Sequence, residues 1–164
     1  MIEDLSGAPA WMSALIAGQL AFLAVIAAYD LRHRKVPNIA IYPAIVIALA
    51  LAFLRPDGPW WTFVAGGAAA AVLFVGLGLA SRGGMGMGDA KLATFIGLMA
   101  GWPGILVAAF VAFGTGAAAG VLLVATGRLG RRDPLPFAPA LAVGALVAAV
   151  AGRQLARALW PGIA

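Results

Sequence analysis

The sequence predicts an all-α, polytopic membrane protein with about six transmembrane helices. Of its 164 residues, 63% are hydrophobic and 10% are charged, whereas an ordinary soluble domain is about half apolar and about a quarter charged. A transmembrane helix needs about 20 predominantly apolar residues, so this chain holds several such helices and little else. We therefore expect one transmembrane domain, residues 1–164, with the lipid bilayer as its solvent.

The candidate helices lie between Pro, Gly and charged residues that interrupt the apolar sequence. They cover residues 11–29, 39–54, 60–80, 90–101, 104–126 and 137–152. An acidic Met-Ile-Glu-Asp start precedes the first helix, where a cleaved signal peptide needs basic residues, so we interpret this helix as a permanent span. The fourth is short and precedes Pro103, which indicates a tilted or incomplete span. Glycines such as Gly66-Gly67, Gly114 and the Gly116/Gly120 pair favour close helix packing, with a dimer face as the alternative.

The basic residues predict the orientation in the membrane. Six spans put both termini on one side, and the positive-inside rule then makes the face with more Lys and Arg cytoplasmic. That face carries Arg32, Arg34, Lys35, Arg82, Lys91, Arg128, Arg131 and Arg132, and the other carries Arg55, Arg153 and Arg157. Tryptophan prefers the headgroup level of a bilayer. All five tryptophans fall at the outer ends of the predicted helices: Trp11, Trp60, Trp61, Trp102 and Trp160.

Composition also excludes several classes of function. The net charge is +5, but the basic residues are split among short loops and form no stripe or arm, so we expect no nucleic-acid partner. The chain has no cysteine, which excludes disulfides and thiolate metal sites.

Two of the six acidic residues are candidates for chemistry. Glu3, Asp4 and Asp57 fall in outer segments, where solvation explains them, and Asp133 lies beside Arg131 and Arg132 as a charge partner. Asp30 directly follows an apolar run and Asp89 directly precedes one, so both carboxylates are expected at the cytoplasmic edge of a span. Ionisable groups at membrane depth are costly and tend to mark functional sites.

For Asp89 alone, helix capping is the simpler interpretation. The residues before Asp89 make capping alone a less sufficient explanation, because four of the eight residues at 81–88 are glycine. Glycine is a poor helix former, and irregular backbone near membrane depth is tolerated only inside protein or beside a watery cavity. A glycine run also lets another backbone approach the carboxylate. Two carboxylates sharing a proton can cleave a peptide, one as base toward water and the other as acid.

Three segments resemble the signatures of the type IV prepilin peptidases, which are membrane aspartic proteases. Asp30-Leu-Arg-His-Arg-Lys-Val-Pro37-Asn38 is similar to the first signature, an Asp followed by an aliphatic-Pro-Asn triplet. Gly86-Met-Gly88-Asp89-Ala-Lys91-Leu92 is similar to the second, the Gly-x-Gly-Asp element followed by x-Lys-Leu. Leu135-Pro136-Phe137-Ala138-Pro139 partly matches a third, with alanine where glycine is usual. The likeness covers about residues 15 to 150.

The resemblance implies an aspartic endopeptidase that removes the short basic leader of prepilin or pseudopilin precursors. It maps the catalytic pair onto Asp30 and Asp89, with Pro37, Asn38, Gly86, Gly88 and Lys91 in support, and it involves neither a metal nor an organic cofactor. The site is expected at the cytoplasmic face of the bacterial inner membrane. Only 29 residues precede Asp30 and cysteine is absent, so the chain looks like the peptidase-only form of tight-adherence Flp pilus systems, without N-methyltransferase activity.

Alternatives remain at several positions. A small transporter or channel subunit would use the same aspartates to bind a cation or relay protons, and a structural assembly subunit would need neither. Lys91 either stabilises the Asp89 anion or anchors a helix start, and Asn38 either caps the second helix or orients Asp30, with capping favoured. Solvation explains His33, and Met85 and Met87 are either gap-fillers or lining for an apolar substrate segment.

Overall fold

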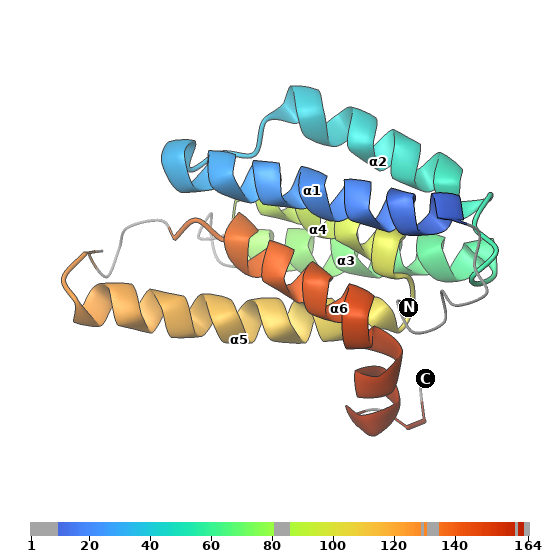
Figure 1. The fold of residues 1–164 in the computed structure, drawn as a ribbon. Coiled ribbons are helices and arrows are strands. Elements are labelled where there is room, and N and C mark those ends of the chain that lie inside the picture. Colours follow the sequence, from blue (N-terminus) through green and yellow to red (C-terminus); the bar gives the residue numbers. More distant parts are fainter. Residues whose placement is uncertain (1–9, 81–85, 129, 131–134, 160, 163–164) are drawn as a thin grey trace.

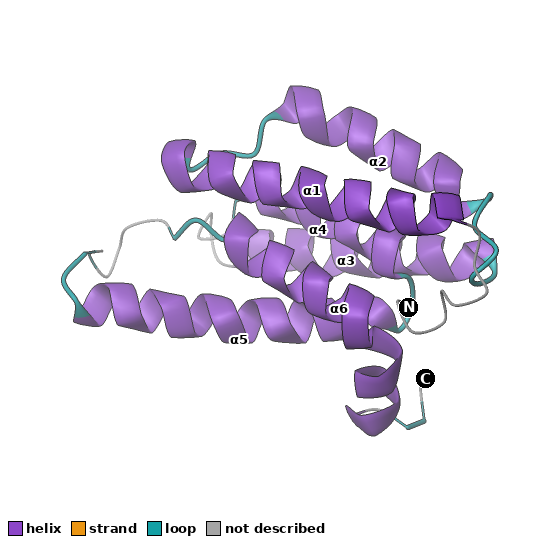
Figure 2. Ribbon diagram, viewed as in Figure 1, coloured by secondary structure: helices purple, strands orange, loops and turns teal. Residues whose placement is uncertain are grey.

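Six α-helices form the described part of the chain in the computed structural model, as Figures 1 and 2 show. This part comprises residues 10–80, 86–128, 130, 135–159 and 161–162, and it contains no strand. The helices are α1 (Ala10–His33), α2 (Asn38–Ala52), α3 (Trp60–Ala80), α4 (Met87–Ala100), α5 (Gly104–Ala125) and α6 (Ala138–Leu159). The all-α prediction is confirmed. α1 and α6 continue beyond their predicted ends. The prediction stopped too early because the last turns of both helices carry charged residues, which a hydropathy criterion excludes from a span.

Successive helices run in opposite directions (Figure 1), which sorts the loops to two ends of the bundle. The last turn of α1 and the first turns of α2, α4 and α6 lie at one end, which we call the Asp30 end. The α2–α3 and α4–α5 loops lie at the other, which we call the Arg55 end. Trp11, Trp60, Trp61 and Trp102 all lie at the Arg55 end, so these four share one end of the bundle, as the prediction requires. The predictions for Glu3, Asp4, Arg82, Met85, Arg131, Arg132, Asp133 and Trp160 lie outside the described residues.

The outer surface of the bundle is apolar, as expected for a multi-pass membrane protein. α1, α3 and α5 are long and apolar enough to cross a membrane, and α2 and residues 138–152 of α6 are shorter apolar helices. Large side chains point outward on several helices, including Ile39 at 88% exposure and Val72 at 75%. Water would disfavour so much exposed apolar surface, whereas lipid does not.

α4 is the central helix of the bundle. It packs on α2, α3, α5 and α6, and most of its residues are buried, from Ala90 through Met99. Its 14 residues span about 21 Å, which is less than the hydrocarbon thickness of about 30 Å. A helix this short is tolerated because protein, and not lipid, surrounds it from Ala90 through Met99. The incomplete fourth span is therefore a core helix.

The backbones of α3 and α4 approach closely at glycines. A methyl group on Gly66 would lie 2.5 Å from the carbonyl oxygen of Gly97, and one on Gly67 would lie 2.7 Å from the Leu98 side chain. Any larger residue would force the helices apart, so these glycines serve packing within the chain. In contrast, Gly76 and Gly114 face open space.

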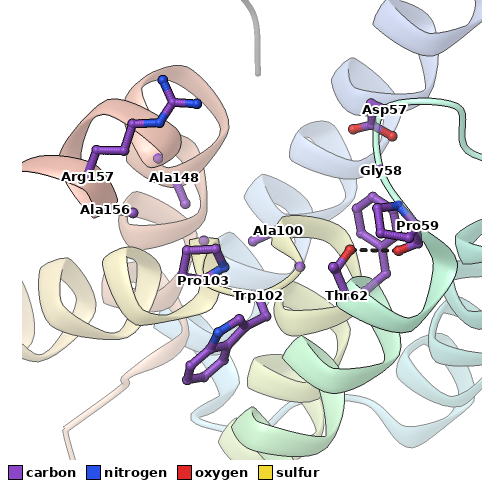
Figure 3. Close-up of a pocket in the computed structure, with 14 residues that line it drawn as sticks. Asp57, Gly58, Pro59, Thr62, Ala100, Trp102, Pro103, Ala148, Ala156 and Arg157 are labelled. Atoms are coloured by element: carbon purple, nitrogen blue, oxygen red, sulfur yellow. Dashed lines mark hydrogen bonds between the residues drawn. The ribbon is translucent and has the colours of Figure 1, made fainter. Parts of the chain in front are cut away.

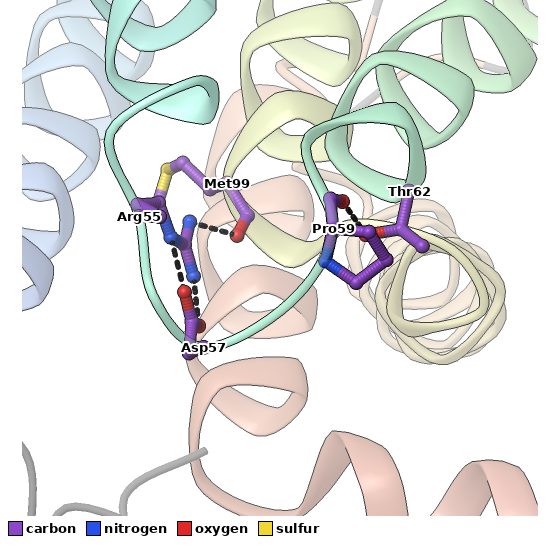
Figure 4. Close-up of polar contacts among 5 residues, drawn as sticks. All are labelled: Arg55, Asp57, Pro59, Thr62 and Met99. Atoms are coloured by element: carbon purple, nitrogen blue, oxygen red, sulfur yellow. Dashed lines mark hydrogen bonds and ion pairs between the residues drawn. The ribbon is translucent and has the colours of Figure 1, made fainter.

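Arg55 and Asp57 form an ion pair at the Arg55 end, which shows that the prediction of a solvated Asp57 is wrong. Arg55 donates from Nε to Oδ1 of Asp57 at 2.9 Å and from Nη2 to Oδ2 at 2.6 Å (Figure 4). Its Nη1 donates to the carbonyl oxygen of Met99 at 2.7 Å, and its guanidinium lies 4.1 Å from the centre of the Phe63 ring. Both charged side chains are nearly buried, at 2% and 8% exposure. Asp57 is thus a partner of Arg55, not a solvated surface residue, because the α2–α3 loop folds onto the end of α4.

Gly66→Ala should destabilise the protein, because its methyl group would collide with the backbone of α4. Overpacking of this kind costs about 1–3 kcal/mol, and we expect a lower midpoint of thermal unfolding in detergent. Gly76→Ala, on the same helix but facing open space, is the matched control. An equal effect of both substitutions would contradict the close α3–α4 contact.

Candidate active site

The bundle has a cavity at each end, and they differ in their acidic groups. The cavity at the Arg55 end, of about 230 Å³, lies between α3, the α4–α5 loop and α6 (Figure 3). Its acidic residue among the described lining is Asp57, which is paired with Arg55. The cavity at the Asp30 end is larger, about 590 Å³, and both Asp30 and Asp89 line it. The structure therefore brings the two candidate carboxylates to one cavity.

Four segments build the wall of this larger cavity, which we call the aspartate cavity. They are the last turn of α1, the α1–α2 loop, the start of α4 and the segment before α6. Besides the two aspartates, its wall contains the basic residues Arg34, Lys35 and Lys91, the apolar residues Val36, Met87, Leu135, Pro136 and Phe137, and Asn38, Gly86 and Gly88. The wall thus combines apolar and basic residues with the two carboxylates.

Asp30 lies in the last turn of α1 and is buried, at 4% exposure. Its Oδ2 accepts a hydrogen bond from the main-chain N–H of Ala138, the first residue of α6, at 3.3 Å. α1 ends just beyond it, where the N–H of Arg34 donates to the Asp30 carbonyl oxygen at 2.7 Å. Arg34 has a φ of 52°, a left-handed conformation that is uncommon for residues other than glycine and that turns the chain toward α2.

Asp89 is the third residue of α4 and precedes the apolar run that starts at Ala90. Burial, more than any other cause, raises its pKa to about 6, and the charge of Asp30 adds to this shift. A hydrogen bond from the Gly86 main chain acts in the opposite direction. Asp89 thus lies in the first turn of α4, whose N-cap residue is Gly86 without a side-chain cap hydrogen bond, and it interacts electrostatically with Asp30.

The glycines of the second signature allow close approach at this point. A methyl group on Gly88 would lie 3.0 Å from Cβ of Val36, in the α1–α2 loop, and one on Gly86 would lie 3.2 Å from Oδ2 of Asp89. The two signature segments are therefore in contact beside the aspartates. Pro37 supports this contact as the N-cap residue of α2, with extended backbone at φ −71° and ψ 121°.

Lys91 and Asn38 form a contact that the sequence did not predict. The ammonium of Lys91 donates to Oδ1 of Asn38 at 2.8 Å and lies 4.6 Å from the centre of the Tyr42 ring. α2 has Pro37 at its N-cap and no side-chain cap hydrogen bond, so the capping prediction for Asn38 is wrong. Lys91 is two residues beyond Asp89 and points to α2, because successive helix positions face different directions.

The remaining predicted residues divide between the cavity and the surface. Met87 lines the aspartate cavity and is 54% exposed. His33 is exposed and stacks on Tyr29, with ring centres 4.1 Å apart. Sequence reasoning missed the roles of Val36, Phe137 and the Ala138 N–H. The Leu135–Pro139 motif indicated that this segment matters. It could not identify the Ala138 N–H, because almost any residue type can supply a main-chain donor.

The chemistry available in this cavity is acid–base chemistry. Two carboxylates that interact cannot both ionise easily, so one proton is shared over a range of pH. In the described part of the chain, no group of three or more His, Cys, Asp or Glu residues is placed to hold a metal ion.

The contact between the signature segments predicts a disulfide in a cysteine-containing variant. We expect Val36→Cys/Gly88→Cys to cross-link on mild oxidation, because the two Cβ positions are close and the native chain has no competing cysteine. Loss of thiol labelling by a maleimide, restored by reductant, measures the cross-link. Val36→Cys/Gly76→Cys is the control and should remain fully labelled; failure of the first pair to cross-link would contradict the described site.

Comparison with known proteins gives a family match and several curated relatives. The type IV leader peptidase family matches residues 17–121, which include both aspartates. A prepilin leader peptidase/N-methyltransferase of Bacillus subtilis is 32% identical over 136 residues, which are 83% of this chain and 55% of the relative. A protein of the same name from Stutzerimonas stutzeri is 26% identical over 131 residues, 77% of this chain and 45% of the relative.

The chain thus spans about half the length of these curated relatives. No solved structure gives a significant match. Because the family match covers more than half of the chain and contains both signature segments, the chain belongs to the type IV leader peptidase family.

Proposed function

We propose that the chain is a membrane aspartic endopeptidase that removes the short basic leader from prepilin-like precursors. Asp30 and Asp89 are the catalytic pair in this proposal, and residues 1–164 act as one peptidase domain. The observation that carries it is the cavity that both aspartates line, in which burial, together with the charge of Asp30, raises the pKa of Asp89. Membership of the family and the names of the relatives support the choice of substrate.

The proposed reaction needs only water and the two carboxylates. The ionised carboxylate accepts a proton from a water molecule, whose oxygen attacks the scissile carbonyl carbon. The protonated carboxylate donates its proton toward the carbonyl oxygen, and the departing amine is protonated when the C–N bond breaks. One water is consumed, and the pair returns to its singly protonated state. The raised pKa of Asp89, about 6, brings its protonated form closer to neutral pH than an ordinary carboxyl group allows.

The walls of the cavity suit a peptide at a membrane surface. The apolar residues Met87, Leu135 and Phe137 offer contacts to a hydrophobic segment. Arg34 and Lys35 also line the cavity, and their charges favour anionic lipid headgroups. We propose that the Asp30 end faces the cytoplasm of a bacterial inner membrane, with the precursor approaching from that side.

Replacing either aspartate should abolish processing. Asp30→Asn and Asp89→Asn each remove a titratable group of the pair while preserving size, and general acid–base catalysis accounts for about 10²- to 10⁴-fold in rate. We expect both variants to reach the membrane at wild-type levels and to leave a co-expressed prepilin uncleaved on immunoblots. Asp4→Asn, the same chemical change in the N-terminal segment, is the control. Normal cleavage by either site variant would refute the proposal.

The proposed orientation can be tested by thiol labelling, since the native chain lacks cysteine. Arg128→Cys, exposed at the Asp30 end, should react with a membrane-impermeant maleimide only after the inner membrane is opened. Trp60→Cys, exposed at the Arg55 end, should react in intact spheroplasts. The reverse pattern would place the aspartate cavity on the outer side.

A further inference from the structure

The first turn of α6 contacts Asp30 through the main chain. The first N–H groups of a helix have no partner within the helix, and here the N–H of Ala138 meets Oδ2 of Asp30 at 3.3 Å in a buried position. Pro139, the next residue, has no N–H. Among the described residues, the other oxygen of the Asp30 carboxyl group accepts no hydrogen bond. One oxygen is therefore held by α6, and the other is left for water or substrate.

A packing contact on the far side of α6 fixes the position of this N–H. Phe137, immediately before Ala138, lies against Gly116 of α5, where a methyl group would come within 2.6 Å of the ring. The Phe137 ring also packs against Phe113, with centres 5.6 Å apart, and Phe74, at 6.3 Å. The glycine leaves a notch in α5 that the Phe137 ring fills. Any change that expels this ring must move the start of α6.

We propose that the Ala138 N–H is a positioning group for the Asp30 carboxylate, held in place by the seating of Phe137 in the Gly116 notch. The inference rests on the proposed function, because it assigns a part in the same reaction. The N–H fixes the rotation of the carboxylate, and together with the positive end of α6 it stabilises the charged form. Helices α5 and α6 thereby belong to the catalytic apparatus although their side chains supply no reacting group.

Other charged groups near Asp30 do not replace this contact. Asp89 faces it from α4 and disfavours its charge. Arg34 and Lys35 line the cavity from the α1–α2 loop and are exposed to solvent. Lys91 of α4 is engaged with Asn38. Among the described residues, only the Ala138 N–H donates a hydrogen bond to the carboxylate of Asp30.

Ala138→Pro removes this donor at the first helical position, where proline is favoured. Because its ring takes the place of the N–H hydrogen beside Asp30 at a fully buried position, thermal unfolding is measured alongside activity. With a prepilin-like peptide that carries a short basic leader before an apolar segment, we expect kcat to fall about 10- to 100-fold and KM to change little. The acidic limb of the pH–rate profile should move to higher pH, because a hydrogen bond to the charged form of Asp30 is lost.

Gly116→Ala tests the same inference from a different helix. Its methyl group would displace the Phe137 ring and with it the N–H, so kcat should fall and the acidic limb should shift in the same direction. Gly114→Ala, two residues away on α5 and facing open space, should match the wild type. The double variant Ala138→Pro/Gly116→Ala should be no worse than the more affected single variant, because both act through one hydrogen bond.

Thermal unfolding in detergent and the Asp30→Asn variant make the outcomes distinct. If Asp30→Asn is inactive while folded Ala138→Pro and Gly116→Ala keep the wild-type pH profile, the positioning role is wrong and the proposed function stands. Additive effects of the two substitutions would likewise overturn the positioning role. If Asp30→Asn still cleaves the peptide, the proposed function itself fails.

Discussion

The close contact between α3 and α4 is the constraint on which the rest of this structure depends. α4 is too short to cross a bilayer alone, and it holds its place because the backbones meet at Gly66 and Gly97, without side chains between them. α4 carries Asp89 in its first turn, so the α3–α4 contact also sets the position of one carboxylate. In lipid, apolar surface gives no net attraction between helices, and close van der Waals packing must supply it. The glycines at the α3–α4 contact are therefore needed to hold Asp89 in the site.

The helices could be predicted from sequence because the bilayer leaves few alternatives. Long apolar runs bounded by Pro59, Pro103 and charged residues define α3 and α5 almost to the residue. The errors occur where polar residues lie inside a helix. α1 continues through Asp30 to His33, because a helix satisfies its own backbone whether or not its side chains are apolar. Hydropathy also cannot distinguish a short span from a short core helix, and α4 is the latter.

The candidate site was predictable to the extent that it consists of side chains with an evident chemical role. Asp30 and Asp89 were singled out because carboxylates at membrane depth need an explanation, and both line one cavity. Asn38 was misinterpreted because its capping role is a local pattern, whereas its actual partner, Lys91, is 53 residues away. Asp57 was misjudged for the same reason, since its burial depends on how the α2–α3 loop folds back. Partners far apart in the chain leave no local pattern in the sequence.

The ion pair at the Arg55 end has a mechanical consequence for the catalytic pair. Arg55 donates a hydrogen bond to the carbonyl oxygen of Met99 near one end of α4, and Lys91, near the other end, donates one to Asn38. A helix held by polar contacts at both ends resists sliding along its axis, since any translation would break both contacts. If substrate entry changes the distance between the two carboxylates, we therefore expect α1 and α6 to move while α4 stays in place.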